Sequence, residues 1–91
     1  MKRYVIERDL PGIGKMNRDQ LKDAAATSNS ALAKMSGKAQ WTQSYVVDDK
    51  TFCIYVADSE ASVREHAKLS GFPANKITEV CTIIDPVTAT A

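Results

Sequence analysis

The fold of this chain is decided at its centre by WTQSYVVDDKTFCIYVA, residues 41–57. Two runs rich in β-branched and aromatic residues, 41–47 and 51–57, flank the polar segment 48–50. Runs of this kind, joined by a short polar connection, are typical of an antiparallel hairpin. The centre of the chain is therefore predicted to be two paired strands.

A helical pattern precedes the hairpin. Asn17 and Gln20 have the spacing of a capping box, which predicts a helix that runs to Ser36. Gly37 suits the position just past its end. Small and apolar residues recur with helical period along this stretch. They form the predicted inward stripe: Leu21, Ala25, Ser28, Leu32 and Met35.

A second helix and two outer strands complete the pattern. The helix is predicted over 60–70, with Ser59 as part of its cap and Gly71 after its end. Apolar runs predict strands over 3–9, near the start of the chain, and over 77–84, near its end. The predicted order is therefore β-α-β-β-α-β.

This order predicts an α+β fold of the ferredoxin-like, split β-α-β type. Right-handed crossovers give a four-stranded antiparallel sheet of order 4-1-3-2 with both helices on one face. With 91 residues the chain is one domain, 1–91, and its small-residue tail 86–91 is expected to be loose.

Composition and charge exclude several classes of protein. Lys and Arg number 12 against 11 Asp and Glu, which argues against a nucleic-acid binder. No apolar run reaches the roughly 18 residues of a membrane span, and no secretory signal follows Met1, so the cytoplasm is expected. Cys53 and Cys81 are predicted on strands about 9–10 Å apart, too far for a disulfide, and are expected to be reduced.

Helices on one side leave the other sheet face uncovered. The most apolar set, Phe52, Ile54 and Val56, is predicted to face the helices, with Tyr4/Ile6 and Val80/Ile84. The uncovered face then receives a half-apolar set: Val5, Glu7, Ser44, Val46, Cys53, Tyr55, Ile77, Glu79, Cys81 and Ile83. Such a face usually marks an interface. A homodimer through the open sheet face is predicted, a dimeric α/β barrel with a pocket between the sheets, lined by Ser44, Cys53, Tyr55 and Cys81.

Glu7 and Glu79 stand inside otherwise apolar strands that are predicted neighbours. We expect the two carboxylates to be cross-strand partners on the uncovered face. Three hypotheses follow. The pair could hold a divalent metal with Cys or His, act as a general acid–base pair beside Tyr55 and Ser44, or form structural ion pairs with Arg3, Arg8 or Lys76.

His66 is the only histidine of the chain. Val63 and Leu69 flank it at helical spacing, so it is expected to be half-buried where its helix meets the sheet. A hydrogen-bonded packing role and a metal-ligand role both stay open. Its helix covers the face opposite that predicted for Glu7 and Glu79. The three could meet at one ion only around a sheet end or across a dimer interface.

An ordered set of residues resembles a small bacterial family whose domain has no assigned function. The set runs from 3–8 with Pro11, through 41–46 and 52–57, to 65–67 with 71–73, and ends with 77–80 and 84–86. The structurally described member of that family is a nickel-binding protein. The resemblance implies a ferredoxin-like fold, dimerisation through the sheets and binding of nickel(II) or another divalent metal. By position, Glu7, His66 and Glu79 match family motif residues and are the implied ligand candidates. It implies no reaction, and whether the protein is an enzyme stays open.

Overall fold

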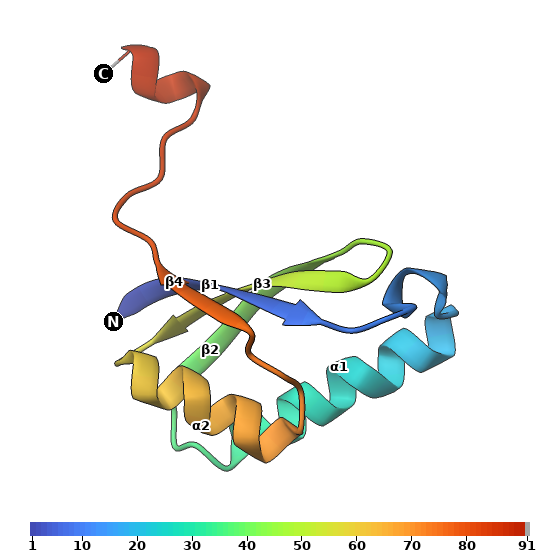
Figure 1. Cartoon of the computed structure of the whole chain (residues 1–91). Coiled ribbons are helices and arrows are strands. Elements are labelled where there is room, and N and C mark those ends of the chain that lie inside the picture. The colour runs from blue at the N-terminus through green and yellow to red at the C-terminus, as the bar shows by residue number, and fades with distance from the viewer. Residues whose placement is uncertain (91) are drawn as a thin grey trace.

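A computed structural model describes residues 1–90 of the chain (Figure 1). It contains a four-stranded antiparallel sheet, two α-helices and two short 3-10 helices. In chain order the elements are β1 (Lys2–Asp9), η1 (Ile13–Lys15), α1 (Arg18–Ala33), β2 (Ala39–Val46), β3 (Lys50–Ala57), α2 (Glu60–Ser70), β4 (Lys76–Glu79) and η2 (Pro86–Thr90).

The predicted topology is confirmed. The strands are arranged β2-β3-β1-β4, which is the order 4-1-3-2 read from the other edge. Figure 1 shows α1 and α2 side by side on one face of this sheet. The α+β ferredoxin-like fold follows from the alternation of helix and strand patterns along the chain.

Local sequence fixes where the two helices begin and end. The Asn17 side chain accepts from the Gln20 amide while the Gln20 side chain accepts from the Asn17 amide, so the predicted capping box is present. Regular helix ends at Ala33, earlier than predicted, and the chain turns through left-handed Ser36 and Gly37 (φ 53° and 78°). Helix α2 has Ser59 as its N-cap and a left-handed Gly71 at its C-cap.

The prediction of which side of β3 faces the helices is wrong. Pairing with β1 sets Tyr4 opposite Tyr55 and Ile6 opposite Cys53. Opposed residues of an antiparallel pair share a face, so the buried set of β3 is Thr51, Cys53, Tyr55 and Ala57. The predicted core set Phe52, Ile54 and Val56 lies half-exposed on the open face.

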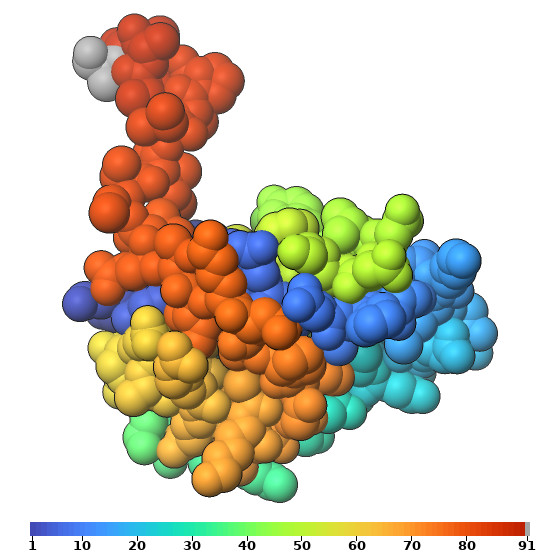
Figure 2. Space-filling view, viewed as in Figure 1, coloured from blue at the N-terminus to red at the C-terminus, as the bar shows by residue number. Residues whose placement is uncertain are grey.

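The last strand is shorter than predicted. Strand β4 ends at Glu79, after which the chain leaves the sheet and ends in η2, projecting from the body as a stalk (Figures 1 and 2). The predicted core residues Val80 and Ile84 are therefore outside the core, and Ile84 is 76% exposed. Ala91, the last residue of the predicted tail, lies outside the described residues. No helix within 1–90 has the length and apolar character needed to cross a membrane.

The core lies between the sheet and the two helices. Tyr4, Ile6 and Tyr55 pack there against Val63 of α2 and Met35 beyond the end of α1. Of the predicted inward stripe of α1, Ser28 and Met35 are buried and Leu32 packs against the core, as expected. The backbone of α1 approaches α2 more closely than it approaches the strands, which leaves space between α1 and the sheet.

Candidate functional site

Glu7 lies on the open face, near the end of β1. It stands opposite Phe52 on one side and opposite Lys76 on the other. Its carboxylate is 3.6 Å from Lys50 Nζ, and the carboxylate of Asp9, two residues along the same face, is 3.8 Å from that same ammonium. Two carboxylates and one lysine therefore form a small charged group at this corner of the sheet.

Glu79 lies on the other side of the sheet, so the predicted carboxylate pair is wrong. Its partner in the register is Tyr4, a helix-facing residue, whereas Glu7 pairs with Lys76. Because neighbours along a strand alternate between faces, the two carboxylates point to opposite sides. Glu79 is half-exposed at the sheet edge and lies 3.5 Å from Lys2. Ion pairing is thus the hypothesis that the register supports, with lysines other than the one predicted.

The same geometry removes the predicted acid–base arrangement. Tyr55 and Ser44 lie on the helix side, in register with Trp41 and Cys53 respectively, while Glu7 is on the open side. Because they lie on opposite faces of the one sheet, no single pocket on one face can contain all three. Exposed Cys81, after β4, is likewise separate from buried Cys53, and both cysteines are free thiols.

His66 is buried beneath the sheet, at 1% exposure. Its Nδ1 lies 3.5 Å from Arg8 Nη2, and its Nε2 lies 3.2 Å from Ser28 Oγ and 3.4 Å from the Ser28 carbonyl. Because arginine can only donate, Nδ1 is the acceptor and Nε2 carries the proton. Burial, and then the charge of Arg8, lower the pKa of His66, so the ring is neutral. Both ring nitrogens are engaged, which leaves neither free for a metal.

Arg8 is the feature that sequence analysis missed, having treated it only as an ion-pair partner at the rim. It is 2% exposed, in the same buried row as Tyr4 and Ile6. Its guanidinium donates to the carbonyls of Phe72 (3.3 Å) and Pro73 (2.9 Å) and to His66. It also lies over the Tyr55 ring, 5.8 Å from the centroid. The sequence signal was its spacing, since positions 4, 6 and 8 share one face of a strand.

A hydrogen-bonded row continues from His66 to the sheet. Ser28 Oγ of α1 lies 3.0 Å from the hydroxyl of Tyr55. Burial raises the pKa of this hydroxyl, although the hydrogen bond with Ser28 and the charge of Arg8 act in the opposite direction. The phenol is therefore neutral. These contacts form a hydrogen-bonded chain that we call the buried relay. Its members are Arg8 of β1, His66 of α2, Ser28 of α1 and Tyr55 of β3.

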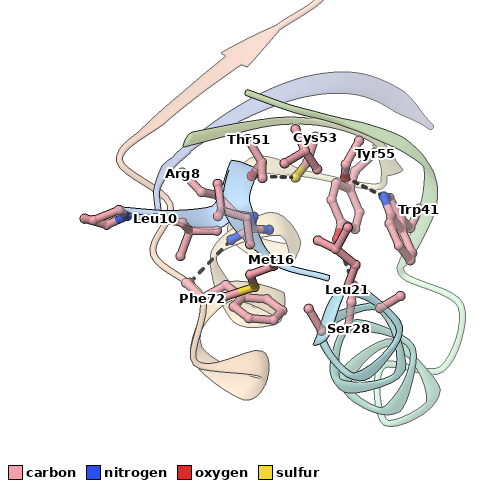
Figure 3. Close-up of a pocket in the computed structure, with 16 residues that line it drawn as sticks. Arg8, Leu10, Met16, Leu21, Ser28, Trp41, Thr51, Cys53, Tyr55 and Phe72 are labelled. Atoms are coloured by element: carbon pink, nitrogen blue, oxygen red, sulfur yellow. Dashed lines mark hydrogen bonds between the residues drawn. The ribbon is translucent and has the colours of Figure 1, made fainter. Parts of the chain in front are cut away.

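The buried relay borders a cavity of about 370 Å³ between α1, the sheet and the β1–α1 connection (Figure 3). Figure 3 shows side chains from all these elements converging on it. Ser44, Cys53 and Tyr55, predicted to line a pocket between sheets, line this cavity instead, on the opposite side of the sheet. Cys53 and Tyr55 change sides because the face of β3 is reversed, and Ser44 of β2 shares their side because it stands opposite Cys53.

The predicted ligands do not fit a nickel site within one copy. Glu7 and Glu79 are on opposite faces, and His66 has no free nitrogen. Among residues 1–90, no three His, Cys, Asp or Glu side chains are grouped closely enough to hold one ion. A metal centre built from these three residues would therefore require another arrangement or a second copy.

Comparison with known proteins identifies the family. A family model described as "Nickel responsive protein SCO4226-like" matches residues 4–80. The chain belongs to the SCO4226-like family. This confirms the resemblance to a small family that includes a nickel-associated protein. No curated protein matches the chain.

A solved structure shows the same fold as this SCO4226-like chain. The crystal structure of SCO4226 from Streptomyces coelicolor A3(2) aligns with a TM-score of 0.75. The alignment covers 90% of this chain and 99% of that chain, at 17% sequence identity. At this identity the likeness shows the fold alone.

Proposed function

We propose that this protein is a cytosolic homodimer that binds nickel(II), or another divalent cation, at the seam between the open sheet faces of two copies. Family membership supports the metal half of the proposal, since the family is described as nickel responsive. One observation carries the proposal as a whole. The open face carries both an uncovered apolar strip, formed by Val5, Tyr45, Phe52 and Ile54, and a pair of carboxylates, Glu7 and Asp9.

The apolar strip favours a second copy as the occupant of this face. Its members pair across neighbouring strands, Val5 with Ile54 and Tyr45 with Phe52, and Tyr45 is 56% exposed. A sheet face left in water usually alternates to polar residues. Here the centre of the face is apolar and Glu7 lies towards its rim, as in interfaces with an apolar core and a polar rim.

The projecting C-terminal segment supports the same assembly. Ile83, Ile84 and Val87 are 62%, 76% and 71% exposed on it. Large apolar side chains gathered on a projecting segment favour contact with another molecule. A second copy, which we propose for the open face, is the partner that fits this segment as well, because the segment leaves the sheet at β4, along the edge of that face.

The metal half rests on the corner formed by Glu7, Asp9 and Lys50. The ammonium of Lys50 already lies 3.6 Å from the carboxylate of Glu7 and 3.8 Å from that of Asp9, where its single positive charge balances one of their two negative charges. A divalent cation could replace it, completing its coordination with water or with the same residues of a second copy. Carboxylates alone select metals weakly, so affinity is expected to follow the general order in which Ni(II) exceeds Co(II) and Mn(II).

Equilibrium dialysis of tag-free protein against Ni(II) tests the metal half. Glu7→Gln should weaken binding, and Lys50→Met, which frees the two carboxylates, should strengthen it. Glu79→Gln is the matched control, because Glu79 carries the same charge on the other face. Equal binding by wild type, Glu7→Gln and Lys50→Met would exclude this corner.

Sedimentation equilibrium tests the dimer half independently. Ile54→Lys places a charge in the middle of the apolar strip and should give a monomer, whereas Lys22→Glu on the exposed face of α1 should leave the assembly unchanged. A wild-type monomer at micromolar concentration would contradict the seam. A dimer that takes up no nickel would retain the assembly and reject the metal.

A further inference from the structure

We propose that the cavity beneath α1 is a binding site for a small apolar monocarboxylate, whose charged end is held by Arg8. This site lies on the helix side of the sheet and does not depend on the open face or on a metal. It therefore stands or falls separately from the function proposed above.

The shape of the cavity follows from the residues of α1. Where this helix lines the cavity it carries Ala24, Ala25 and Ser28, whose small side chains leave space between the helix and the sheet, although Ser28 Oγ meets the long side chain of Tyr55. The resulting space of about 370 Å³ lies within the range of roughly 300–1,000 Å³ that is typical of small-molecule sites. The space is partly open to solvent, so a ligand can enter it from outside.

Arg8 supplies a charge without a counter-charge. Among the described residues, no carboxylate lies within 4.0 Å of its guanidinium, and it is the only charged residue lining the cavity. His66 and Tyr55 beside it are neutral, because burial lowers the pKa of one and raises the pKa of the other. A buried, unpaired charge is costly, and an anion in the cavity would compensate it.

Arg8 also has donors left to offer. Its hydrogen bonds run from Nη1 to the two carbonyls and from Nη2 to His66, and none involves Nε. Within residues 1–90 no fully buried side-chain nitrogen lacks a partner, so Nε retains some access to solvent. Arg8 borders the cavity. Nε and the neighbouring Nη2 form the edge of a guanidinium that can donate two parallel hydrogen bonds to a carboxylate.

The buried relay adds a third donor. Nε2 of His66 donates to Ser28, so the Ser28 hydroxyl is free to donate its own proton to the oxygen of Tyr55. The proton of Tyr55 is then available to a ligand oxygen in the cavity. The guanidinium of Arg8 on β1 and the hydroxyl of Tyr55 on β3 can thus donate to the same anion. Their hydrogen bonds with His66 and Ser28 set the orientation of these two donors.

The remaining walls define the rest of the ligand. They are apolar and partly aromatic, and include Ile13, Leu21, Trp41 and Phe72. The single positive charge of Arg8 balances a ligand with one negative charge, whereas a phosphate dianion would leave one negative charge unbalanced. Met16, at the edge of the cavity and 39% exposed, is a flexible side chain suited to an entrance. These features specify a monoanion with an apolar body.

The single tryptophan of the chain provides the assay, since Trp41 lines the cavity. Full-length wild-type protein is titrated with octanoate at neutral pH while Trp41 fluorescence is followed, and binding is confirmed by calorimetry. 1-Octanol, which has the same chain but no charge, is the comparison ligand, and inorganic phosphate tests for an anion site without an apolar wall. Octanoate should bind saturably and more tightly than octanol, and phosphate should not bind.

Two kinds of variant locate the site. Arg8→Met should weaken octanoate roughly 10- to 100-fold, the effect of losing a charge-assisted hydrogen bond, and leave octanol unchanged. Ala25→Leu fills the cavity from α1 without touching the buried relay and should abolish binding of both compounds. Ala26→Leu is its matched control, because Ala26 is exposed on the same helix and does not line the cavity.

The outcomes separate cleanly. Equal affinity for octanoate and octanol would remove Arg8 from recognition, and binding of phosphate without octanoate would overturn the apolar class. Octanoate binding that survives Ala25→Leu would place the ligand elsewhere, and no binding at all would reject the proposal. If Arg8→Met fails to fold by circular dichroism, the comparison of Ala25→Leu with Ala26→Leu still decides the site.

Discussion

Neighbouring residues of β1 meet opposite surroundings on the two faces of the sheet. Ile6 and Arg8 are 0% and 2% exposed beneath the helices, while Val5 and Glu7, which alternate with them along the strand, lie half-exposed on the open face. Each face carries both an apolar residue and a charge. The helix face buries its charge beside a cavity, and the open face pairs its carboxylates with the partly exposed Lys50. Apolar character alone therefore does not mark the core of this protein.

The largest contrast is expected between two apolar residues. Ile6→Ala removes a fully buried side chain and should lower the free energy of unfolding by about 2–5 kcal/mol. Val5→Ala should cost less than about 1 kcal/mol in an isolated copy, because Val5 is already half-exposed. Urea denaturation of both variants at low protein concentration measures the difference. Similar losses would contradict the assignment of the two faces.

The next contrast is between the two charges. Arg8→Met leaves two backbone carbonyls and His66 without their donor and should cost about 2–4 kcal/mol. Glu7→Gln removes a partly exposed ion pair with Lys50 and should cost no more than about 1 kcal/mol. Urea denaturation at one pH and one salt concentration compares them. A greater loss from Glu7→Gln than from Arg8→Met would reverse the comparison.

The buried relay predicts a dependence of stability on pH. The pKa of His66 is lowered from 6.5 in the folded protein. Below pH 6.5 the unfolded chain therefore binds a proton that the folded chain does not, and the free energy of unfolding decreases as the pH falls. The slope from one proton is at most about 1.4 kcal/mol per pH unit. His66→Gln should flatten the profile between pH 6.5 and 5 relative to wild type, and parallel profiles would contradict the neutral, buried imidazole.

Element order was predictable because each element carries its own local signal. The capping box at Asn17, the left-handed glycine at 71 and the hairpin at 48–50 act over a few residues. The face of β3 was not predictable in the same way. Both alternating sets of that strand are apolar enough to be buried, and only its register with Tyr4 and Ile6 on β1 decides between them.

The candidate site was harder to predict because it depends on contacts between distant segments. Arg8 is held by carbonyls more than sixty residues away in sequence, at Phe72 and Pro73. Ser44, Cys53 and Tyr55 were predicted to line a pocket between two sheets, whereas they line a cavity under the helices. Assigning a strand to the wrong face reverses every one of its side chains. The error in β3 therefore moved Cys53 and Tyr55, and the same error applies to Ser44 of β2, which stands opposite Cys53.

The smallest expected effect tests the two carboxylates directly. Glu7 and Glu79 point to opposite faces and pair with different lysines, Lys50 and Lys2. Independent sites give additive changes in stability within about 0.3–0.5 kcal/mol. Glu7→Gln and Glu79→Gln should therefore add in the double variant. If the two carboxylates instead faced each other across the strands, either single substitution would already relieve their repulsion. The change in stability of the double variant would then differ from the sum of the two single changes. Because the expected coupling is close to zero, the cycle should be measured at low ionic strength, where any repulsion would be least screened.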